Sequence, residues 1–270
     1  MEYSEDRMST VARVEFTNYR ESVNRALDLI GTPGLLPQKG LIIVKPNLTN
    51  SSPPPVTTHV DMAEAVLAYV RKYTGAEIAI GEGCGSGTTG DTFEANGYTD
   101  MAERNSIRLI DFNTEPADCL RNPDALHLKE FHMPAAAADA FIISVPVLKD
   151  HSFTDTTIAM KNMFGLAPAP FYSGSWNKSK LHSPSTHASV VDVCLYKKPG
   201  LSIVDASVAL SGMHLAGTPR GLNRILAGTD PVAVDAVGTR LMGHDPAQVE
   251  YLQLAQKKGI GTIDSIKIIS

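Results

Sequence analysis

The sequence of 270 residues contains only three cysteines, Cys84, Cys119 and Cys194, and no Cys-x-x-Cys pair. An all-cysteine iron–sulfur site needs more thiolates than this, so no iron–sulfur cluster is expected on the chain. Few, scattered cysteines are typical of a reducing compartment, where buried thiols are their ordinary role. No apolar run approaches the roughly 20 residues that cross a bilayer, so no membrane partner is expected.

Basic residues are in the minority, because 24 Lys and Arg stand against 29 Asp and Glu, for a net charge of −5. Nucleic-acid surfaces depend on clustered Lys and Arg that neutralise phosphates, so nucleic acid is not an expected partner. The N-terminus, MEYSEDRMST, is acidic where a signal peptide would be basic, and no apolar segment follows it. The expected location is therefore the cytoplasm.

What the sequence does contain is an alternation of β-rich runs and amphipathic stretches along its whole length. Runs such as LIIV and FIISV are almost continuously apolar, which is typical of strands buried on both faces of a parallel sheet. The pattern predicts a single α/β domain over residues 1–270, with a mixed, mostly parallel sheet layered with helices and two lobes around a cleft. Strands are predicted at residues 11–16, 41–45, 77–80, 107–112, 140–145, 201–205, 224–227 and 266–269.

Helical and irregular segments have local signals of their own. Residues 60–73 place apolar side chains on one helical face. Asp230-Pro231 and Asp245-Pro246 each combine a capping carboxylate with a proline suited to the first turn, so a helix is predicted to begin at each. Residues 167–189, which include APAPFYSGSWNKSKLHSPSTH, are rich in Pro, Ser and Gly. Their aromatic content favours a packed, functional loop over a disordered one.

Polar residues follow two of the predicted strands, where open α/β sheets bind ligands. Lys45 and Asn47 follow LIIV and bring a cation and an amide to a strand end, where a carboxylate or phosphate could be held. A solvated lysine beside a Pro-Asn turn is the alternative. GEGCGSGTTG follows the next strand, and because glycine lets the backbone approach a ligand, the amides of Gly83 and Gly85 are expected to bind an anion.

The same glycine loop fits the pattern G-x-G-x-x-G, and Asp111 lies 21 residues beyond it, as in a dinucleotide fingerprint. The register is poor, however, because about five residues separate the strand from the first glycine of the pattern, and Gly97 soon interrupts the following helix. A dinucleotide-dependent oxidoreductase is therefore the weaker alternative.

The densest polar group follows FIISVPV. Lys149, Asp150 and His151 end this run, and Lys161 and Asn162 return on a helix-like segment. Histidine can bind a metal or move a proton near neutral pH, and a desolvated lysine can be a base or a covalent anchor. These five residues are expected to form a site, although a lone histidine is more often structural.

Two further carboxylates are candidates. Asp205 ends the predicted strand 201–205 and is a candidate ligand-binding residue. Asp235 lies in the apolar run PVAVDAVG, where an unpaired carboxylate would be costly, so it needs a basic partner or a role.

Five separated blocks carry a resemblance to a known family. VKPNL, GEGCGSGTTGDTFEANGY, SVPVLKDHSFTDTTIAMKNMFG, SIVDA and LAGTDPVAVDAVGTRLMG are similar, in order and spacing, to the uncharacterised family called domain of unknown function 362. The similarity extends over about residues 11–261. Many members carry a fused ferredoxin module with cysteine-rich motifs, which this sequence lacks.

A more distant resemblance is to the catalytic domain of lactate racemase, which uses a nickel-pincer nucleotide tethered to a lysine. In that family a histidine lies ten residues before the lysine, and His151 and Lys161 have the same spacing. His182 could replace a later metal-binding histidine, at a longer spacing. The glycine loop lacks that family's histidine, and VKPNLTN lacks its arginine. The resemblance implies a shared fold, ligand cleft and Lys/His pair, and neither racemisation nor nickel.

Together these features predict an enzyme or cofactor-handling protein that binds a small anion, with Lys161 as base, anchor or charge clamp and His151 as acid/base. A divalent metal on His151 and His182 is a further expectation, and Asp150 or Asp205 is the expected orienting partner. The alternative is a non-catalytic carrier or partner for a metal- or redox-cofactor system, which would contact another protein through the aromatic residues of the 167–189 loop.

Overall fold

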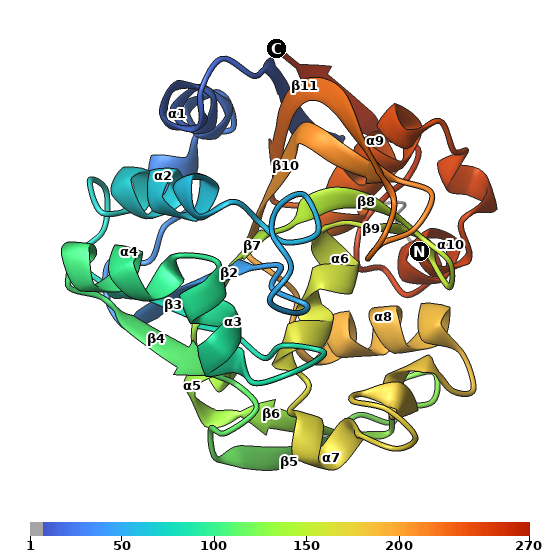
Figure 1. Ribbon diagram of the computed structural model, residues 1–270. Coiled ribbons are helices and arrows are strands. Elements are labelled where there is room, and N and C mark those ends of the chain that lie inside the picture. Colours follow the sequence, from blue (N-terminus) through green and yellow to red (C-terminus); the bar gives the residue numbers. More distant parts are fainter. Residues whose placement is uncertain (1–7) are drawn as a thin grey trace.

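The apolar runs of the sequence become parallel strands at the centre of one sheet. The computed structural model describes residues 8–270, which form a ten-stranded mixed sheet and a separate two-stranded sheet. In the large sheet the order is β12-β1-β11-β10-β7-β2-β3-β4. Its parallel centre consists of β10 (Leu201–Ser211), β7 (Phe141–Val145), β2 (Leu41–Pro46), β3 (Glu77–Glu82) and β4 (Arg108–Asp111). The predicted α/β class, with a mixed, mostly parallel sheet layered with helices, is confirmed (Figure 1), while the two lobes stay a prediction.

Antiparallel pairs complete one side of the sheet. There β11 pairs with both β10 and β1, and β12 runs parallel to β1. A short hairpin of β8 and β9 leaves the end of β7 and joins the sheet through β10. The small sheet pairs β5 with β6. The bounds are β1 Ser9–Glu15, β11 Thr218–Gly228, β12 Ile266–Ile269, β8 Val147–His151, β9 Asp155–Thr157, β5 Ala117–Arg121 and β6 Glu130–Pro134.

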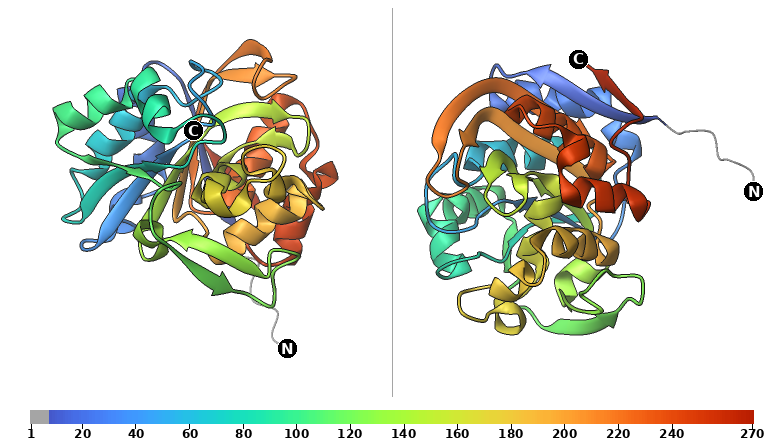
Figure 2. Two further views of the ribbon diagram at one scale, coloured as in Figure 1. Left: turned by 60° about the horizontal axis from the view of Figure 1, so that its bottom comes forward. Right: turned by 90° about the vertical axis from the view of Figure 1, so that its right-hand side faces the viewer.

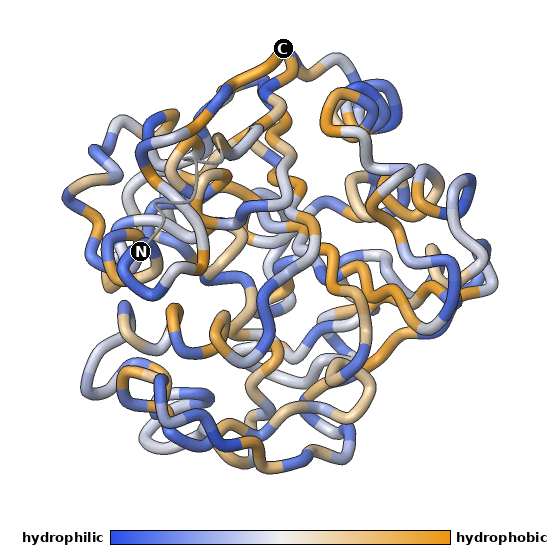
Figure 3. Tube along the Cα trace, turned by 180° about the vertical axis from the view of Figure 1, so that it is seen from behind, coloured by the Kyte–Doolittle hydropathy of each residue, from blue (hydrophilic) through white to orange (hydrophobic). Residues whose placement is uncertain are grey.

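Helices cover both faces of the sheet because successive strand residues point to opposite sides. On β2, Ile42 and Val44 pack into a core with α1 (Tyr19–Leu29), α2 (Val60–Val70) and α4 (Tyr98–Asn105), while Ile43 packs into a second core on the opposite face. The second face is covered by α6 (Ala159–Asn162), α8 (Thr186–Tyr196), α9 (Pro231–Met242) and α10 (Glu250–Lys257). Figure 2 shows both layers, and Figure 3 shows hydrophobic residues gathered along the central strands.

Short helices fill the connections. They are α3 (Thr89–Ala95), α5 (Ala135–Ala138) and α7 (Ala169–Tyr172), with 3-10 turns η1 (Thr32–Gly34), η2 (Met163–Leu166), η3 (Ser179–His182) and η4 (Pro246–Gln248). The segment 167–189 is thus folded rather than extended, since it holds α7, η3 and the start of α8. None of the helices in residues 8–270 combines the length and apolar character that a bilayer crossing needs.

The two predicted helix starts have different outcomes. Asp230 caps α9 as predicted, because its Oδ1 accepts hydrogen bonds from the backbone N–H groups of Val232 and Ala233. Asp245 caps only the single turn η4, through the N–H of Ala247. The chain leaves helical geometry at Val249, and α10 begins at Glu250. An Asp-Pro capping signal therefore predicts where a helical turn begins, whereas tertiary packing decides how long the helix becomes.

Candidate functional site

A cavity of about 280 Å³ lies where the carboxyl ends of β2 and β3 meet the β8–β9 hairpin and the segment from α6 to η3. We call it the strand-end cavity. The tip of the long β10–β11 hairpin reaches it from another side, through His214 and Leu215. Its titratable and amide side chains are Asn47, Asn50, Glu82, Lys149, His151, Lys161, Asn162, Asn177, Lys178, His182 and His214.

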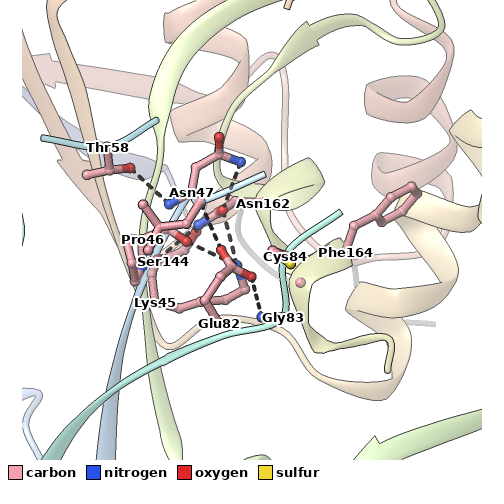
Figure 4. Close-up of polar contacts among 12 residues, drawn as sticks. Lys45, Pro46, Asn47, Thr58, Glu82, Gly83, Cys84, Ser144, Asn162 and Phe164 are labelled. Atoms are coloured by element: carbon pink, nitrogen blue, oxygen red, sulfur yellow. Dashed lines mark hydrogen bonds and ion pairs between the residues drawn. The ribbon is translucent and has the colours of Figure 1, made fainter. Parts of the chain in front are cut away.

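Beneath the cavity lies a hydrogen-bonded cluster, the floor, made by Lys45, Glu82 and Asn162 (Figure 4). Lys45 is fully buried, and its Nζ donates to Glu82 Oε2 at 2.9 Å, to Asn162 Oδ1 at 3.2 Å and to the carbonyl oxygen of Pro46 at 3.1 Å. Burial lowers the pKa of Lys45, and the Glu82 carboxylate opposes this effect. The ammonium group at the floor is thus compensated by one charge and two neutral acceptors.

The other two members of the floor are satisfied as well. Glu82 also accepts from the backbone N–H groups of Leu48 and Gly83. The amide nitrogen of Asn162 donates to the carbonyl oxygen of Lys45 and to Ser144 Oγ, each at 3.0 Å. A buried polar network with every member paired is rigid. The floor therefore fixes the ends of β2 and β3 relative to α6.

Three more lysines, the wall lysines, surround the space above the floor: Lys149, Lys161 and Lys178. Lys149 Nζ donates to Asn47 Oδ1 and to the carbonyl oxygen of Val56, each at 2.8 Å. Burial lowers the pKa of Lys149 to about 7. Its ammonium form has no carboxylate within hydrogen-bond reach among residues 8–270, and only neutral acceptors hold it.

Lys178 is held in the same manner. Its backbone adopts the left-handed region, with a φ of 58°, which is uncommon for a residue with a side chain. Its Nζ donates to the carbonyl oxygen of Gly83 at 2.6 Å, with the carbonyl oxygen of Gly165 at 3.4 Å. Burial lowers the pKa of Lys178 to about 8. Strained backbone of this kind is often found at functional sites.

Lys161 has the least compensation of the four. It is only 9% exposed, and its Nζ lies 3.7 Å from the ring centroid of Phe164. No hydrogen bond within residues 8–270 involves this amine, which lines the strand-end cavity. Burial, followed by the charges of Lys149, Lys178 and Lys45, lowers the pKa of Lys161 to about 7. An amine of this kind exists in both protonation states near neutral pH, so it can bind an anion, take a proton or act as a nucleophile.

The helix that carries Lys161 is positioned by Asp235. The carboxylate accepts from the backbone N–H groups of Ala159, at 2.7 Å, and Met160, at 3.2 Å, at the start of α6. The hydroxyl of Tyr251 donates to it as well, at 3.0 Å. Burial raises the pKa of Asp235 to about 7. Of the two alternatives predicted for Asp235, a basic partner or a role, residues 8–270 supply the second, because the carboxylate holds the first turn of α6.

Three histidines line the same space. The ring of His151 stacks on that of His214, with centroids 4.0 Å apart, and lies parallel to that of His182 at 6.5 Å. His151 Nδ1 accepts from the backbone N–H of Phe153. Burial, and then the charge of Lys161, lowers the pKa of His151 far below its usual range. Burial together with neighbouring lysines lowers the pKa of both His182 and His214 to about 4. All three rings are therefore neutral at pH 7, and the ring of His151, whose Nδ1 accepts from Phe153, carries its proton on Nε2.

The cavity does not fit a metal ion held by the protein alone. Among residues 8–270 no group of three or more His, Cys, Asp or Glu side chains is arranged to hold one. The wall lysines also disfavour a cation between His151 and His182. A metal site at these two histidines stays a prediction.

The glycine loop differs from expectation. Gly83 and Gly85 line the cavity, but the backbone N–H of Gly83 donates to Glu82 and that of Gly85 to the carbonyl oxygen of Thr49. The N–H groups of Cys84 and Ser86 are also bonded within the protein. The amides of Gly83 and Gly85 are therefore not free to bind an anion, and the positively charged groups at the cavity are lysine side chains.

Two predicted carboxylates lie elsewhere. Asp150 accepts from the backbone N–H of Gly212 and pairs with His244, whose Nε2 lies 2.8 Å from its Oδ1. Asp205 accepts from the hydroxyls of Tyr19 and Ser207. Neither aspartate lines the strand-end cavity, so neither orients His151.

The structure brings together Asn47, Lys149, His151, Lys161, Asn162 and His182 at the cavity, with Lys45 beneath them. Sequence reasoning missed Lys178 and His214, and it gave Glu82 no role in the floor. The only signal for Lys178 is its place in an aromatic-rich loop, and the only signal for His214 is its place between two strands.

Comparisons with known proteins identify the family of this chain and a solved structure with a similar fold. A family model described as Domain of unknown function (DUF362) matches residues 42–240. The thylakoid-associated protein sll1697 of Synechocystis sp. (strain ATCC 27184 / PCC 6803 / Kazusa) is 25% identical over 245 residues, covering 88% of this chain and 74% of that protein.

Among solved structures, the lactate racemase apoprotein from Thermoanaerobacterium thermosaccharolyticum is similar, with a TM-score of 0.53 and 14% sequence identity. The match covers 89% of this chain and 58% of the racemase chain, so the present chain corresponds to little more than half of that protein. At this identity the likeness shows a shared fold alone.

Proposed function

The chain belongs to the family described as Domain of unknown function 362, and from that premise we propose that it is an enzyme or cofactor-handling protein that binds a small anion in its strand-end cavity. The anion is a carboxylate or a phosphate. The observation that carries the proposal is the surplus of buried positive charge. Lys45, Lys149, Lys161 and Lys178 are each at most 9% exposed, and Glu82 is the single carboxylate among the residues that line the cavity.

Uncompensated buried charge is costly, so this arrangement lowers stability in the absence of an anion. A bound carboxylate or phosphate would accept hydrogen bonds from the wall lysines and restore the charge balance. Clusters of buried groups with shifted pKa values are characteristic of functional sites. A site built in this way selects for negative charge on its ligand.

Two residues would act on the bound molecule. In its amine form Lys161 serves as a base or a nucleophile, and in its ammonium form it clamps the anion. The neutral ring of His151 donates its Nε2–H to the bound anion, because its Nδ1 already accepts from the backbone N–H of Phe153, and burial and the charge of Lys161 disfavour its protonated form at pH 7. The site needs segments from Asn47 to Leu215, so we propose that residues 1–270 work as one domain. The cytoplasm remains the proposed location.

Replacing Lys161 with Met tests the proposal. We expect the affinity for whichever probe binds, acetate or inorganic phosphate, to fall at least about tenfold, measured by chemical-shift titration. We also expect the free energy of unfolding at pH 7 to rise by roughly 1 to 3 kcal/mol, because a desolvated charge is removed. Lys39→Met is the matched control, since Lys39 is exposed. Unchanged affinity in a folded Lys161→Met protein would refute the role of Lys161, and a wild type that binds no carboxylate or phosphate, with or without an apolar group, would refute the proposal.

A second candidate is a non-catalytic carrier or partner module. It is favoured by exposed aromatic residues in the 167–189 loop, where Trp176 is 55% and Phe171 is 41% exposed. Tyr172, which was also expected on this contact surface, is only 5% exposed and packs against Phe131. Recovery of a stoichiometric protein partner at native abundance, with no small molecule bound, would favour this candidate.

The dinucleotide alternative is weakened at the start of the glycine loop. The backbone N–H groups from Gly83 to Ser86 all donate within the protein. A rise in thermal stability with NAD(P) or flavin would nonetheless restore it.

A further inference from the structure

The strand-end cavity has an apolar rim, formed by Phe153, Trp176 and Leu215. Apart from Met8 and Met213, these are the three most exposed of the large apolar side chains in residues 8–270, at 53%, 55% and 44%. They come from three separate segments: the β8–β9 turn, the loop before η3 and the β10–β11 tip. Single exposed apolar residues are ordinary on a protein surface, but a cluster around one opening marks an interaction site.

These side chains border the same opening as the wall lysines. Trp176 and Leu215 line the cavity directly. The ring of Phe153 lies 5.5 Å from that of His182 and 5.9 Å from that of His151, and the ring of Trp176 lies 6.1 Å from that of His182. The interior is therefore cationic and the mouth is apolar, with the histidine rings between them.

We infer that the anion bound in this cavity is amphiphilic: a carboxylate or phosphate head that reaches the wall lysines, joined to an apolar group that leaves through the mouth and packs on the rim. This inference rests on the proposed function and adds the substrate class. The charge of the head matches the lysines, and the apolar group matches the side chains that the protein otherwise leaves in water. A ligand such as acetate or phosphate alone would leave the rim uncovered.

The test is a comparison of matched anions that differ only in their apolar part: acetate with hexanoate, and methyl phosphate with hexyl phosphate. Dissociation constants are measured by chemical-shift titration of the full chain. Each methylene that packs on the rim is expected to tighten binding about two- to fourfold, so the six-carbon member should bind at least about tenfold more tightly than its partner. Hexyltrimethylammonium has the same tail without the anion and is expected not to bind.

The double variant Phe153→Ser/Leu215→Ser should reduce the tenfold preference for the longer anion to less than about threefold. Leu35→Ser is the matched control, because Leu35 is 42% exposed and does not line the cavity, and it should keep the preference. If the double variant weakens binding of both members of a pair equally, the rim contributes to the binding of any anion and does not contact an apolar group of the ligand. This result would overturn the inference.

The remaining outcomes separate this inference from the proposed function. If acetate and hexanoate bind equally and Lys161→Met weakens both, the anion site stands and the amphiphilic ligand is refuted. If hexyltrimethylammonium binds as well as hexanoate, the rim is an apolar docking surface unrelated to the charge, and the inference is refuted. If none of the four anions binds, the proposed function itself fails.

Discussion

The floor and the wall of the strand-end cavity both contain buried lysines, yet they compensate the charge differently. At the floor, Lys45 Nζ meets a carboxylate oxygen, an amide oxygen and a backbone carbonyl. At the wall, Lys161 Nζ faces the ring of Phe164 at the cavity and makes no hydrogen bond within residues 8–270. A buried network in which every polar group is hydrogen-bonded stabilises the fold. A buried lysine without a countercharge is instead suited to binding an anionic ligand. The two lysines are therefore expected to respond in opposite ways to substitution.

The largest effect is expected at the floor, from Glu82→Gln. The substitution leaves the Lys45 ammonium buried without a countercharge, so the free energy of unfolding should fall by about 3 to 5 kcal/mol, measured by urea denaturation. Glu77→Gln on the same strand is the control, because Glu77 forms an exposed ion pair with Arg108 and its loss should cost less than about 1 kcal/mol. A Glu82→Gln protein as stable as wild type would show that the floor does not depend on this charge.

Gly165→Ala tests how closely the chain approaches the floor. A Cβ at Gly165 would overlap Glu82 Oε1 and come within 2.5 Å of Lys45 Nζ. We expect a loss of roughly 1 to 3 kcal/mol in the free energy of unfolding. Gly34→Ala is the control, since a Cβ there meets nothing within 4 Å. Equal stability of the two variants would mean that the floor tolerates displacement.

The wall should make anion binding depend on pH. The pKa of Lys161 is lowered to about 7, and that of Lys178 to about 8, so the free protein loses protons from the wall between pH 7 and 9. Because an anion favours the ammonium forms, its dissociation constant should rise over this range, by up to about tenfold per pH unit for each proton taken up. Calorimetry in buffers of different ionisation enthalpy would measure the proton uptake.

The same shifts make stability rise with pH. Lysines in the unfolded chain keep their ordinary pKa of 10.5, so between pH 7 and 10 the unfolded state binds more protons than the folded state. The contribution of the wall lysines to the free energy of unfolding should therefore increase across this window. A Lys161→Met protein should show a shallower slope, and an identical slope would contradict the shifted pKa.

The smallest effect is expected outside both regions, from Asp150→Asn. Asp150 bonds to His244 and to the backbone of Gly212, away from the cavity. Affinity for the small anion should stay within about twofold of wild type, and the free energy of unfolding should change by no more than about 1 kcal/mol. A tenfold weaker affinity for the anion would show that Asp150 contributes to ligand binding.

Much of the parallel sheet could be predicted because its strands are continuous apolar runs. The ends of those runs also predicted that Lys45, Asn47 and Lys149 would come together. The β8–β9 hairpin was not foreseen, since most of its residues from Lys149 onward are polar. Side chains alternate along β8, so Lys149 and His151 face the cavity while Asp150 between them faces away.

The remaining site residues depend on how distant loops fold. Strand β10 continues past Asp205 to Ser211, so Asp205 lies within a strand and bonds to Tyr19 of α1. Lys178 reaches Gly83 across 95 positions of sequence, and His214 meets His151 only through the tip of the β10–β11 hairpin. Contacts of this kind arise from tertiary packing and leave no local pattern in the sequence.

Trp176 is the only tryptophan in the sequence, and it stands half-exposed beside His182 at the cavity opening. Indole emission depends strongly on the water around the ring, so the intrinsic fluorescence of the whole protein comes largely from this one position. Any molecule that enters or covers the opening will alter that signal without a dye or a label. The intrinsic fluorescence of Trp176 can therefore report ligand binding, and it is suited to screening large compound collections for the natural ligand.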